Sequence, residues 1–325
     1  MVSLSKRIVK IGTRGSKLAM VQAGKTASMM KQLFPDVDFQ IIQVKTAGDQ
    51  DQNTPLSQMG GTGVFVKELE KALKSGTIDI AVHSAKDLPS ELPEGFTIAA
   101  VPERESVYDA LISREGHTLD TLPKGSIIAT GSPRRRALVK WKRRDLKFCE
   151  ARGNVDTRLR KLKAGEFDAI ILAAAGLRRL KLESEISETL SNNSFPPALG
   201  QGCIAIEVLD NDEETYSTVA AIDNRKHHLK LIAERSLLSR LGAGCASAVG
   251  GCARFEDVTL IIEVSVLDIE GENRIDTIIK REMSDNTWET NERIAVETGI
   301  EAAEDLFRKG AADLMTPENA SDSLE

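Results

Sequence analysis

Arginines that follow predicted strands are the residues of this chain whose type and spacing point most directly to chemistry. The segment 130–161 carries twelve Lys or Arg residues and three acidic residues, a local net charge of +9, whereas the whole chain carries −6. Such a concentration of positive charge indicates an anionic ligand. Because a planar guanidinium group binds a carboxylate through two parallel hydrogen bonds, a ligand rich in carboxylates is the natural candidate.

The first turn of this segment places two arginines at the start of a helix. An apolar run at 126–130 predicts a buried strand. Pro133 suits the first turn of the helix that follows, which makes Ser132 the N-cap. Arg134 and Arg135 then lie beside free backbone N–H groups, where anions are attracted.

A second turn repeats this arrangement. The run 146–149 predicts a strand, Arg152 follows it beside a glycine, and the next helix carries Arg158. If both strands are parallel, their ends deliver arginines to one edge of a sheet and form a carboxylate-binding crevice. The alternative is a solvated basic face, and it fits four other residues of the segment: Lys140, Lys142, Arg143 and Arg144.

The N-terminal part of the chain shows the same pattern. A strand is predicted at 7–12 and a helix at 17–33, and the turn between them carries Arg14 and Ser16. One interpretation is a further carboxylate contact. The other is an ordinary capped helix start with a solvated arginine.

A predicted strand at 78–82 ends in a carboxylate. Lys86 and Asp87 follow it, so Asp87 is placed for acid/base or ion-stabilising chemistry. The alternative is a surface ion pair or a turn before Pro89. His83 is interpreted as a hydrogen-bonded structural histidine rather than a ligand.

Cys245 lies in the small, glycine-rich stretch 241–251, which we interpret as a loop. An accessible thiol on a flexible backbone is a candidate nucleophile or attachment point; the alternative is an incidental free cysteine. The other three cysteines sit in or beside strand-like runs. Neither the cysteines nor the four histidines have metal-ligand spacing, so no metal site is expected.

Composition limits the possible classes of protein. A chain of 325 residues with 41% hydrophobic and 28% charged residues is expected to form two or three globular domains. Its net negative charge and its aromatic content of 4% argue against a nucleic-acid binder. Apolar runs too short for a bilayer and the lack of a signal-peptide h-region predict a cytoplasmic protein with free thiols.

The order of the predicted elements indicates the domains. Two alternating α/β units are joined by two crossings, which predicts a pair of lobes with a cleft between them. Lobe one is predicted at 1–104 and 200–222, and lobe two at 105–199. Residues 223–325 are predicted to form a separate α+β domain that carries the loop cysteine.

Eight segments of the chain together resemble the porphobilinogen deaminase (hydroxymethylbilane synthase) family, and the set is far more specific than any one motif. They follow the family's order: IGTRGSKLAMVQA (11–23), GGTGVFVKELE (60–70), DIAVHSAKDLP (79–89), TGSPRRR (130–136), RGNVDTRL (152–159), DAIILAAAGLRRL (168–180), PPALGQG (196–202) and AERSLLSRLGAGC (233–245). The implied fold is α/β, with two periplasmic-binding-protein-like lobes of mixed sheets with helices on both faces, plus a C-terminal α+β domain.

The resemblance also implies a function. Four porphobilinogen molecules lose ammonia and join head to tail on a covalent dipyrromethane cofactor, and water releases hydroxymethylbilane for tetrapyrrole and heme biosynthesis. Each pyrrole carries an acetate and a propionate, so the growing chain is a polyanion that arginines can hold. Loss of ammonia leaves positive charge at the ring nitrogen, which a carboxylate stabilises. A monomer with no nucleic-acid or membrane partner is expected.

Site residues are carried over by the resemblance, position by position. Asp87 is the catalytic carboxylate, and Cys245 forms a thioether to the cofactor. The other implied cofactor ligands are Lys86, Ser132, Arg134, Arg135, Arg158 and Gly202. The implied substrate ligands are Arg14, Ser16, Arg152, Arg179 and Gln201, of which Gln201, with Gly202, belongs to the hinge between the lobes. Thr62, Gln58 and Ala248 depart from the family's usual lysines and proline.

Two other functions remain open on the residues alone. A non-catalytic sensor of dicarboxylates would explain the arginines but not Asp87 or the thiol loop. An RNA-binding protein would use the basic segment 130–161, which offers only Trp141 and Phe148 as aromatic platforms.

Overall fold

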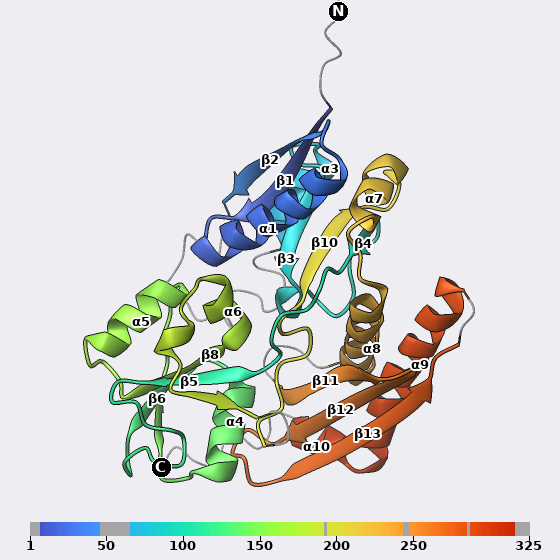
Figure 1. The fold of residues 1–325 in the computed structure, drawn as a ribbon. Helices are drawn as coiled ribbons and strands as arrows, with labels where there is room; N and C mark the ends of the chain where they lie inside the picture. Colours follow the sequence, from blue (N-terminus) through green and yellow to red (C-terminus); the bar gives the residue numbers. More distant parts are fainter. Residues whose placement is uncertain (1–6, 46–65, 192–193, 243–246, 285–286, 316–325) are drawn as a thin grey trace, which may run out of the picture. The chain divides into compact units, whose positions relative to one another are not determined.

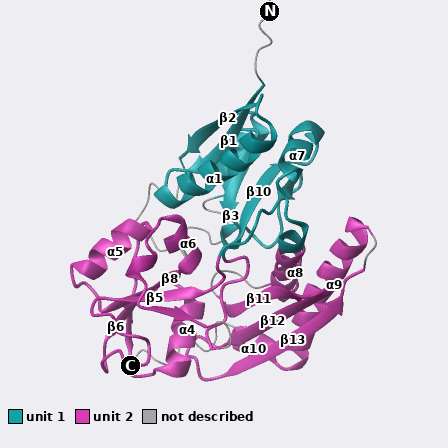
Figure 2. Cartoon of the chain, in the orientation of Figure 1, with its two compact units in different colours: residues 1–105, 202–228 teal, residues 106–201, 229–325 magenta. Residues whose placement is uncertain are grey.

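The computed structural model describes residues 7–45, 66–191, 194–242, 247–284 and 287–315. The chain divides into two compact units, residues 1–105 with 202–228 and residues 106–201 with 229–325 (Figure 2). The described residues form three sheets (Figure 1). Each unit is considered by itself below.

The sheet of the first unit has the order β2-β1-β3-β10-β4. Strands β1, β2 and β3 are parallel, and β10 is antiparallel to both β3 and β4. The strands are β1 (Ile8–Arg14), β2 (Asp38–Val44), β3 (Ile80–Ser84), β4 (Phe96–Ala100) and β10 (Ile204–Leu209). Alternate residues point to opposite faces, so Ile80 and Val82 join a different hydrophobic cluster from Ala81.

Helices cover both faces of this sheet. One hydrophobic cluster holds residues of α1 (Lys17–Leu33) and α7 (Glu213–Ala220), and the other holds Leu69 and Leu73 of α3 (Lys67–Lys74). A layer of helices on each side keeps the strands buried, so that functional side chains emerge only at their ends.

The second unit begins with a sheet of the same plan, β7-β6-β8-β5-β9. Strands β6, β7 and β8 are parallel, and β5 is antiparallel to β8 and β9. The strands are β5 (Asp109–Ser113), β6 (Ile127–Ala129), β7 (Lys147–Cys149), β8 (Ala169–Ala173) and β9 (Glu188–Leu190). One face packs on α4 (Pro133–Lys142), and the other on α5 (Val155–Lys163) and α6 (Ala174–Arg179).

The last part of the second unit is an antiparallel sheet with helices. Its strands are β11 (Ala248–Glu256), β12 (Thr259–Leu267) and β13 (Arg274–Glu282), and its helices are α8 (Arg225–Leu241), α9 (Trp288–Arg308) and α10 (Ala311–Met315). The predicted fold class, two α/β lobes followed by an α+β domain, is confirmed. The predicted domain boundaries stay a prediction.

Two local predictions were wrong. The stretch interpreted as a loop up to residue 251 contains the start of β11, because its small residues allow close packing: a Cβ on Gly250 would lie 2.6 Å from the carbonyl oxygen of Pro196. The segment 175–179 is the second case: Gly176, close behind a strand-like run at 168–173, predicts a glycine turn carrying arginines, whereas the segment lies in helix α6. Short helices of small residues lack the apolar periodicity on which such predictions depend.

None of the helices in the described ranges has the length and hydrophobicity needed to cross a bilayer.

Candidate functional site

A small hollow with a cavity volume of about 70 Å³, open to solvent, lies at the carboxyl ends of β1 and β3 in the first unit. Because these strands are parallel neighbours, their ends meet at one edge of the sheet. Arg14 is the last residue of β1, Ser16 caps α1, and Asp87 lies in the 3-10 turn after β3. The full lining is Arg14, Ser16, Leu18, Ala19, Gln22, Val66, Val82, His83, Ser84 and Asp87.

Asp87 lies at this hollow on a turn that backbone hydrogen bonds hold in place. The backbone N–H of Ala85 donates to the carbonyl oxygen of Cys203 at 3.1 Å, and that of Leu88 donates to Ala85 at 3.2 Å. Asp87 is exposed, whereas Lys86 is half-buried. An ionised carboxylate held at the wall of a hollow can stabilise a cation that forms there.

Ser16 is the N-cap residue of α1. Its hydroxyl accepts a hydrogen bond from the backbone N–H of Ala19 at 3.2 Å, which fixes the first turn of α1. The half-buried Arg14, two residues earlier, therefore leaves the sheet beside the positive end of a helix. This pairing of a guanidinium with a helix N-terminus suits a carboxylate ligand.

His83 and Glu207 form a buried pair in the same unit. Their side chains meet at 2.9 Å between Nε2 and Oε2, with His83 lining the hollow. The interpretation of His83 as hydrogen-bonded is confirmed. Glu207 was missed, although a charged residue inside the apolar strand Ile204–Leu209 was a usable signal.

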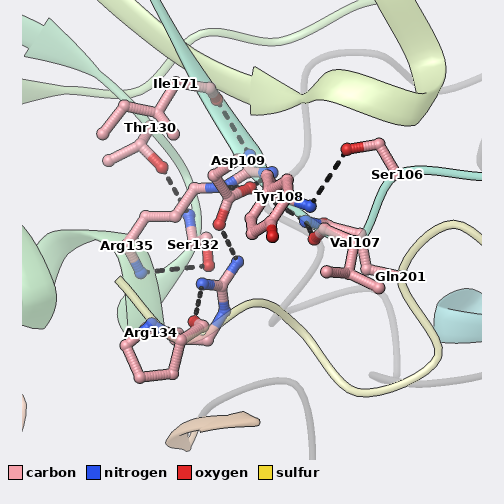
Figure 3. A network of polar contacts seen from close by, with 11 residues as sticks. Ser106, Val107, Tyr108, Asp109, Thr130, Ser132, Arg134, Arg135, Ile171 and Gln201 are labelled. Atoms are coloured by element: carbon pink, nitrogen blue, oxygen red, sulfur yellow. Dashed lines mark hydrogen bonds and ion pairs between the residues drawn. The ribbon is translucent and has the colours of Figure 1, made fainter. Parts of the chain in front are cut away.

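Arg134 and Arg135 start helix α4 in the second unit. Ser132 is the N-cap, as predicted, and its hydroxyl accepts from the backbone N–H of Arg135 at 3.4 Å, with Pro133 in the first turn. Both arginines are nevertheless buried, with exposed fractions of 4% and 8%. Their guanidinium groups lie in a polar network centred on Asp109 (Figure 3).

Asp109 is completely buried and contacts both guanidinium groups. Arg134 Nη2 lies 2.8 Å from Asp109 Oδ2, and Arg135 donates from Nε and Nη2 to Oδ1 at 3.0 and 2.6 Å. Both guanidinium groups also donate to backbone carbonyl oxygens, Arg134 Nη1 to Pro196 at 2.6 Å and Arg135 Nη1 to Ile171 at 2.8 Å. Sequence reasoning missed Asp109, because it directly precedes an apolar run and carries no local motif.

Two cations share one carboxylate in this network. Burial lowers the pKa of Arg134, and the neighbouring positive charge of Arg135 lowers it further, while Asp109 acts in the opposite direction. With both arginines charged, the network holds one positive charge more than Asp109 neutralises. A buried excess of this kind favours an added anionic group.

Gln201 joins the same network. Its amide Nε2 donates to the carbonyl oxygen of Val107 at 2.7 Å and lies 3.2 Å from Asp109 Oδ1. Gly202, the next residue, belongs to the first unit, has φ of 88°, and accepts a hydrogen bond from the N–H of Glu105 at 3.1 Å. A positive φ of this size favours glycine.

The remaining arginines are half-buried and follow the parallel strands of the second unit. Arg152 comes after β7, with its Nε 3.5 Å from Glu150 Oε2, and Arg158 donates from Nε to the carbonyl oxygen of Gly153 at 2.8 Å. Arg179 ends α6, which follows β8. Since β6 and β7 are parallel, the structure brings Arg152 to the edge of the sheet where α4 begins.

Basic residues at and just after the end of α4 are paired with acids. Arg143 contacts Asp145 at 2.7 Å, Arg144 contacts Glu272 at 3.2 Å, and Lys140 contacts Glu270. These pairs reduce the charge that a nucleic-acid backbone would meet.

Three of the sequence predictions fall outside the described residues: the cofactor thioether at Cys245 and the departures at Thr62 and Gln58. The third departure, Ala248, is the buried first residue of β11. In the part of the chain that the structure describes, no group of three His, Cys, Asp or Glu side chains is arranged to hold a metal ion.

Two family models match the chain. Residues 9–217 match "porphobilinogen deaminase, dipyromethane cofactor binding domain", and residues 228–308 match "porphobilinogen deaminase, C-terminal domain". A porphobilinogen deaminase of Brevibacillus brevis is 41% identical over 94% of this chain and 96% of its own length. One of Pelotomaculum thermopropionicum is 40% identical over 95% of this chain and 96% of its own length.

The similarity to solved structures is more distant. The VFT2 domain of BvgS from Bordetella pertussis is 18% identical, with a TM-score of 0.40 over 66% of this chain and 86% of that domain. An arginine-specific periplasmic binding protein of Salmonella typhimurium is 13% identical, with a TM-score of 0.38 over 66% of this chain and 91% of that protein.

Proposed function

Because the chain belongs to the porphobilinogen deaminase family, we propose that the hollow at Asp87 is where porphobilinogen loses ammonia and is joined to the growing tetrapyrrole. Enzymes of this family, also called hydroxymethylbilane synthases, are transferases. They link four porphobilinogen molecules head to tail on a dipyrromethane primer and release hydroxymethylbilane for tetrapyrrole and heme biosynthesis. One observation carries the proposal: Arg14, Ser16 and Asp87 line one hollow.

Asp87 is the catalytic residue of the proposal. When ammonia leaves porphobilinogen, positive charge forms at the ring nitrogen, and the ionised carboxylate of Asp87 stabilises it. The turn that holds Asp87 is fixed by backbone hydrogen bonds, so the carboxylate needs little rearrangement as the charge forms. Its exposure to solvent lets it also exchange protons during departure and coupling.

Arginines at the strand ends hold the acetate and propionate groups of the substrate. Arg14 and Ser16 serve in the first unit, and Arg152 and Arg179 in the second, together with Gln201, the last residue before the chain returns to the first unit. Arg14 is the last residue of β1, Arg179 is the last residue of α6, and Arg152 comes three residues after β7. Attachment to these packed elements limits their freedom and favours bidentate contacts.

The residues present fit the dipyrromethane cofactor. Its side-chain carboxylates match the excess positive charge of Arg134 and Arg135 over Asp109, and the N-terminus of α4 is capped by Ser132 beside them. The remaining proposed ligands are Lys86, Arg158, Gly202 and the thiol of Cys245. When bound, the cofactor supplies a nucleophilic pyrrole carbon as the starting point of the chain.

The setting of the enzyme is part of the proposal. We infer a cytoplasmic monomer that takes porphobilinogen as a small-molecule substrate and needs neither nucleic acid nor membrane. The acidic partners of Lys140, Arg143 and Arg144 support this choice over an RNA-binding surface.

Intact-protein mass spectrometry tests the proposed attachment. The purified protein is expected to carry an adduct of two pyrrole units, which Cys245→Ser lacks and the control Cys149→Ser keeps. An unmodified mass in active protein would contradict it. Reversible binding of dicarboxylates by unmodified, inactive protein would instead favour an anion sensor.

A further inference from the structure

Helix α4, which carries Arg134 in its first turn, packs against the C-terminal sheet of the same unit (Figure 1). The helix contacts both β11 and β12. Ala248 and Leu267, one from each strand, share a hydrophobic cluster with Ala137 and Leu138 of the helix. The place of a proposed cofactor arginine therefore depends in part on residues more than a hundred positions further along the chain.

Gly250 of β11 lies directly against the side chain of Arg134. A Cβ at this position would lie 2.6 Å from the carbonyl oxygen of Pro196 and 3.0 Å from Cδ of Arg134. The same carbonyl oxygen accepts the hydrogen bond from Arg134 Nη1 at 2.6 Å. The N–H of the neighbouring Gly251 donates to the carbonyl oxygen of Pro197 at 2.8 Å, which holds this segment against the strand. Only a glycine at 250 leaves room for so close an approach.

Gly271 makes a second close contact, with the backbone of α4. It lies in the turn between β12 and β13 and has φ of 65°. A Cβ here would lie 2.9 Å from the backbone nitrogen of Trp141 and closer still to the carbonyl oxygen of Ala137. These two atoms belong to one turn of the helix, so the turn at Gly271 rests on the helix backbone itself rather than on its side chains.

Ion pairs on both sides of Gly271 join the turn to the helix and its C-terminal end. Glu270 pairs with Lys140, and Glu272 Oε1 lies 3.2 Å from Arg144 Nη1. Both pairs are partly exposed, and pairs of this kind contribute little to stability. The two close glycine contacts, rather than these charges, therefore determine how near the sheet lies to α4.

Arg134 also contacts the buried Asp109, with 2.8 Å between Nη2 and Oδ2 (Figure 3). We propose that Gly250 and Gly271 are positioning residues for Arg134. They let the C-terminal sheet pack so closely on α4 that the guanidinium reaches Pro196 and Asp109 together and is held ready for a carboxylate of the cofactor. The proposal deepens, and rests on, the proposed function. Both glycines act through α4 and Arg134 rather than on the reacting atoms.

A methyl group at either glycine forces its neighbours to move, because an added group in a close-packed site cannot be accommodated in place. The hydrogen bond from Arg134 to Pro196 is the first to suffer, since its acceptor is the atom that a Cβ at 250 would meet. A misplacement of about 1 Å can lower a rate by roughly 100-fold. Porphobilinogen is held by other arginines in the proposed function, so its KM should change little.

The first test is the kinetics of Gly250→Ala in the holoenzyme. Its kcat is expected to fall by about tenfold or more, with KM within about twofold. Gly24→Ala, on α1, is the control, because a Cβ there meets no atom of the described residues within 4 Å outside the backbone of its own helix. It should follow the wild type. Wild-type kcat in folded Gly250→Ala would overturn the proposal.

A double-mutant cycle shows whether Gly250 acts through Arg134. Arg134→Lys already removes the donor to Pro196, so adding Gly250→Ala should lower kcat by less than about twofold more. A merely structural role of Gly250 would give the full tenfold loss in both backgrounds. Losses that multiply in this way would overturn the proposal.

Gly271→Ala tests the second contact. Its control is Gly116→Ala, since Gly116 has a similar φ of 77° but the described residues place no atom within 4 Å of its Cβ. Both variants carry the strain of a positive φ, and only Gly271→Ala also displaces α4. Its kcat is expected to be lower than that of Gly116→Ala by about fivefold or more, at similar KM. Equal kcat values would overturn the role of Gly271.

A crystal structure of Gly250→Ala gives a result that does not depend on turnover. The distance from Arg134 Nη1 to the carbonyl oxygen of Pro196, 2.6 Å in the wild type, is expected to exceed about 3.5 Å. An unchanged distance would overturn the proposal, and Gly271→Ala serves for the same measurement if Gly250→Ala does not fold. Failure of the proposed function is separate: the wild type would then lack the pyrrole adduct and turnover, whereas this distance would still change.

Discussion

Arg135 donates two hydrogen bonds, from Nε at 3.0 Å and from Nη2 at 2.6 Å, to a single oxygen of Asp109 in the interior of the second unit. The other oxygen of the same carboxylate faces Arg134 at 2.8 Å. One buried acid thus fixes two guanidinium groups at the first turn of α4. The positions of Arg134 and Arg135, two of the proposed cofactor ligands, therefore depend on this buried acid.

Asp109→Asn should destabilise the protein by about 3–5 kcal/mol, since it leaves two buried guanidinium groups without their counter-charge. Urea denaturation of the variant and the wild type measures the difference. Asp145→Asn is the matched control, because the Asp145–Arg143 pair is half-buried rather than fully buried, and its effect should be smaller. A loss below about 1 kcal/mol for Asp109→Asn would show that the interior tolerates the unpaired charge.

Local signals made the start of α4 predictable, whereas the partner of its arginines was not. Ser132 and Pro133 lie beside the helix that they begin, so the sequence contains the cap and the first turn together. Asp109 is 26 residues away from Arg135 along the chain. Only the pairing of β5 with β8 brings it there, and strand order is not encoded in any single motif.

The same reasoning explains which other site residues could be predicted from the sequence and which could not. Arg14 and Asp87 were identified because each follows a strand, and the parallel pairing of β1 and β3 then places both at one hollow. The partner of His83 is 124 residues away and was not foreseen. The start of β11 was missed because small residues lack the apolar alternation from which strands are recognised.

Asp87→Asn is expected to lower kcat by about 10²–10³-fold, the usual effect of removing one charge-stabilising group. The fold and the pyrrole adduct should survive, because Asp87 is exposed and its turn is held by backbone hydrogen bonds. Steady-state kinetics and intact mass check both points. Asp36→Asn, at an exposed aspartate, should keep wild-type kinetics. Near-normal turnover in Asp87→Asn would exclude this carboxylate from catalysis.

Arg14→Gln is expected to reduce kcat/KM by about 10–100-fold, because a charge-assisted hydrogen bond contributes roughly 1.5–3 kcal/mol. Most of the change should appear in KM if the contact holds a substrate carboxylate throughout the reaction. Lys25→Gln removes an equal charge from the exposed side of α1 and controls for general electrostatics. Equal losses in the two variants would contradict a specific contact at Arg14.

Asp305→Asn should weaken the C-terminal domain at neutral pH. The hydrogen bond with Lys309, followed by those with Thr277 and Arg308, holds the pKa of Asp305 well below its usual range. A lowered folded-state pKa stabilises the protein fully above the unfolded value near 3.8, and this contribution declines as the pH falls from that value toward the folded-state pKa. The difference from the wild type in urea denaturation should therefore shrink between pH 5 and pH 3. A difference independent of pH would indicate a steric effect instead.

Glu70→Gln should have the opposite effect on stability at neutral pH, because burial and then Glu207 raise the pKa of Glu70 in the folded protein. A raised pKa for an acid means that ionisation opposes folding, so this cost is absent well below the ordinary value of 4.5 and grows as the pH rises through it. The variant should therefore be more stable than the wild type at pH 7.5 and similar to it at pH 4, as measured by urea denaturation. Glu94→Gln, at an exposed glutamate, should change neither value. If Glu70→Gln were less stable at both pH values, the carboxylate would be a required hydrogen-bonding group rather than a strained charge.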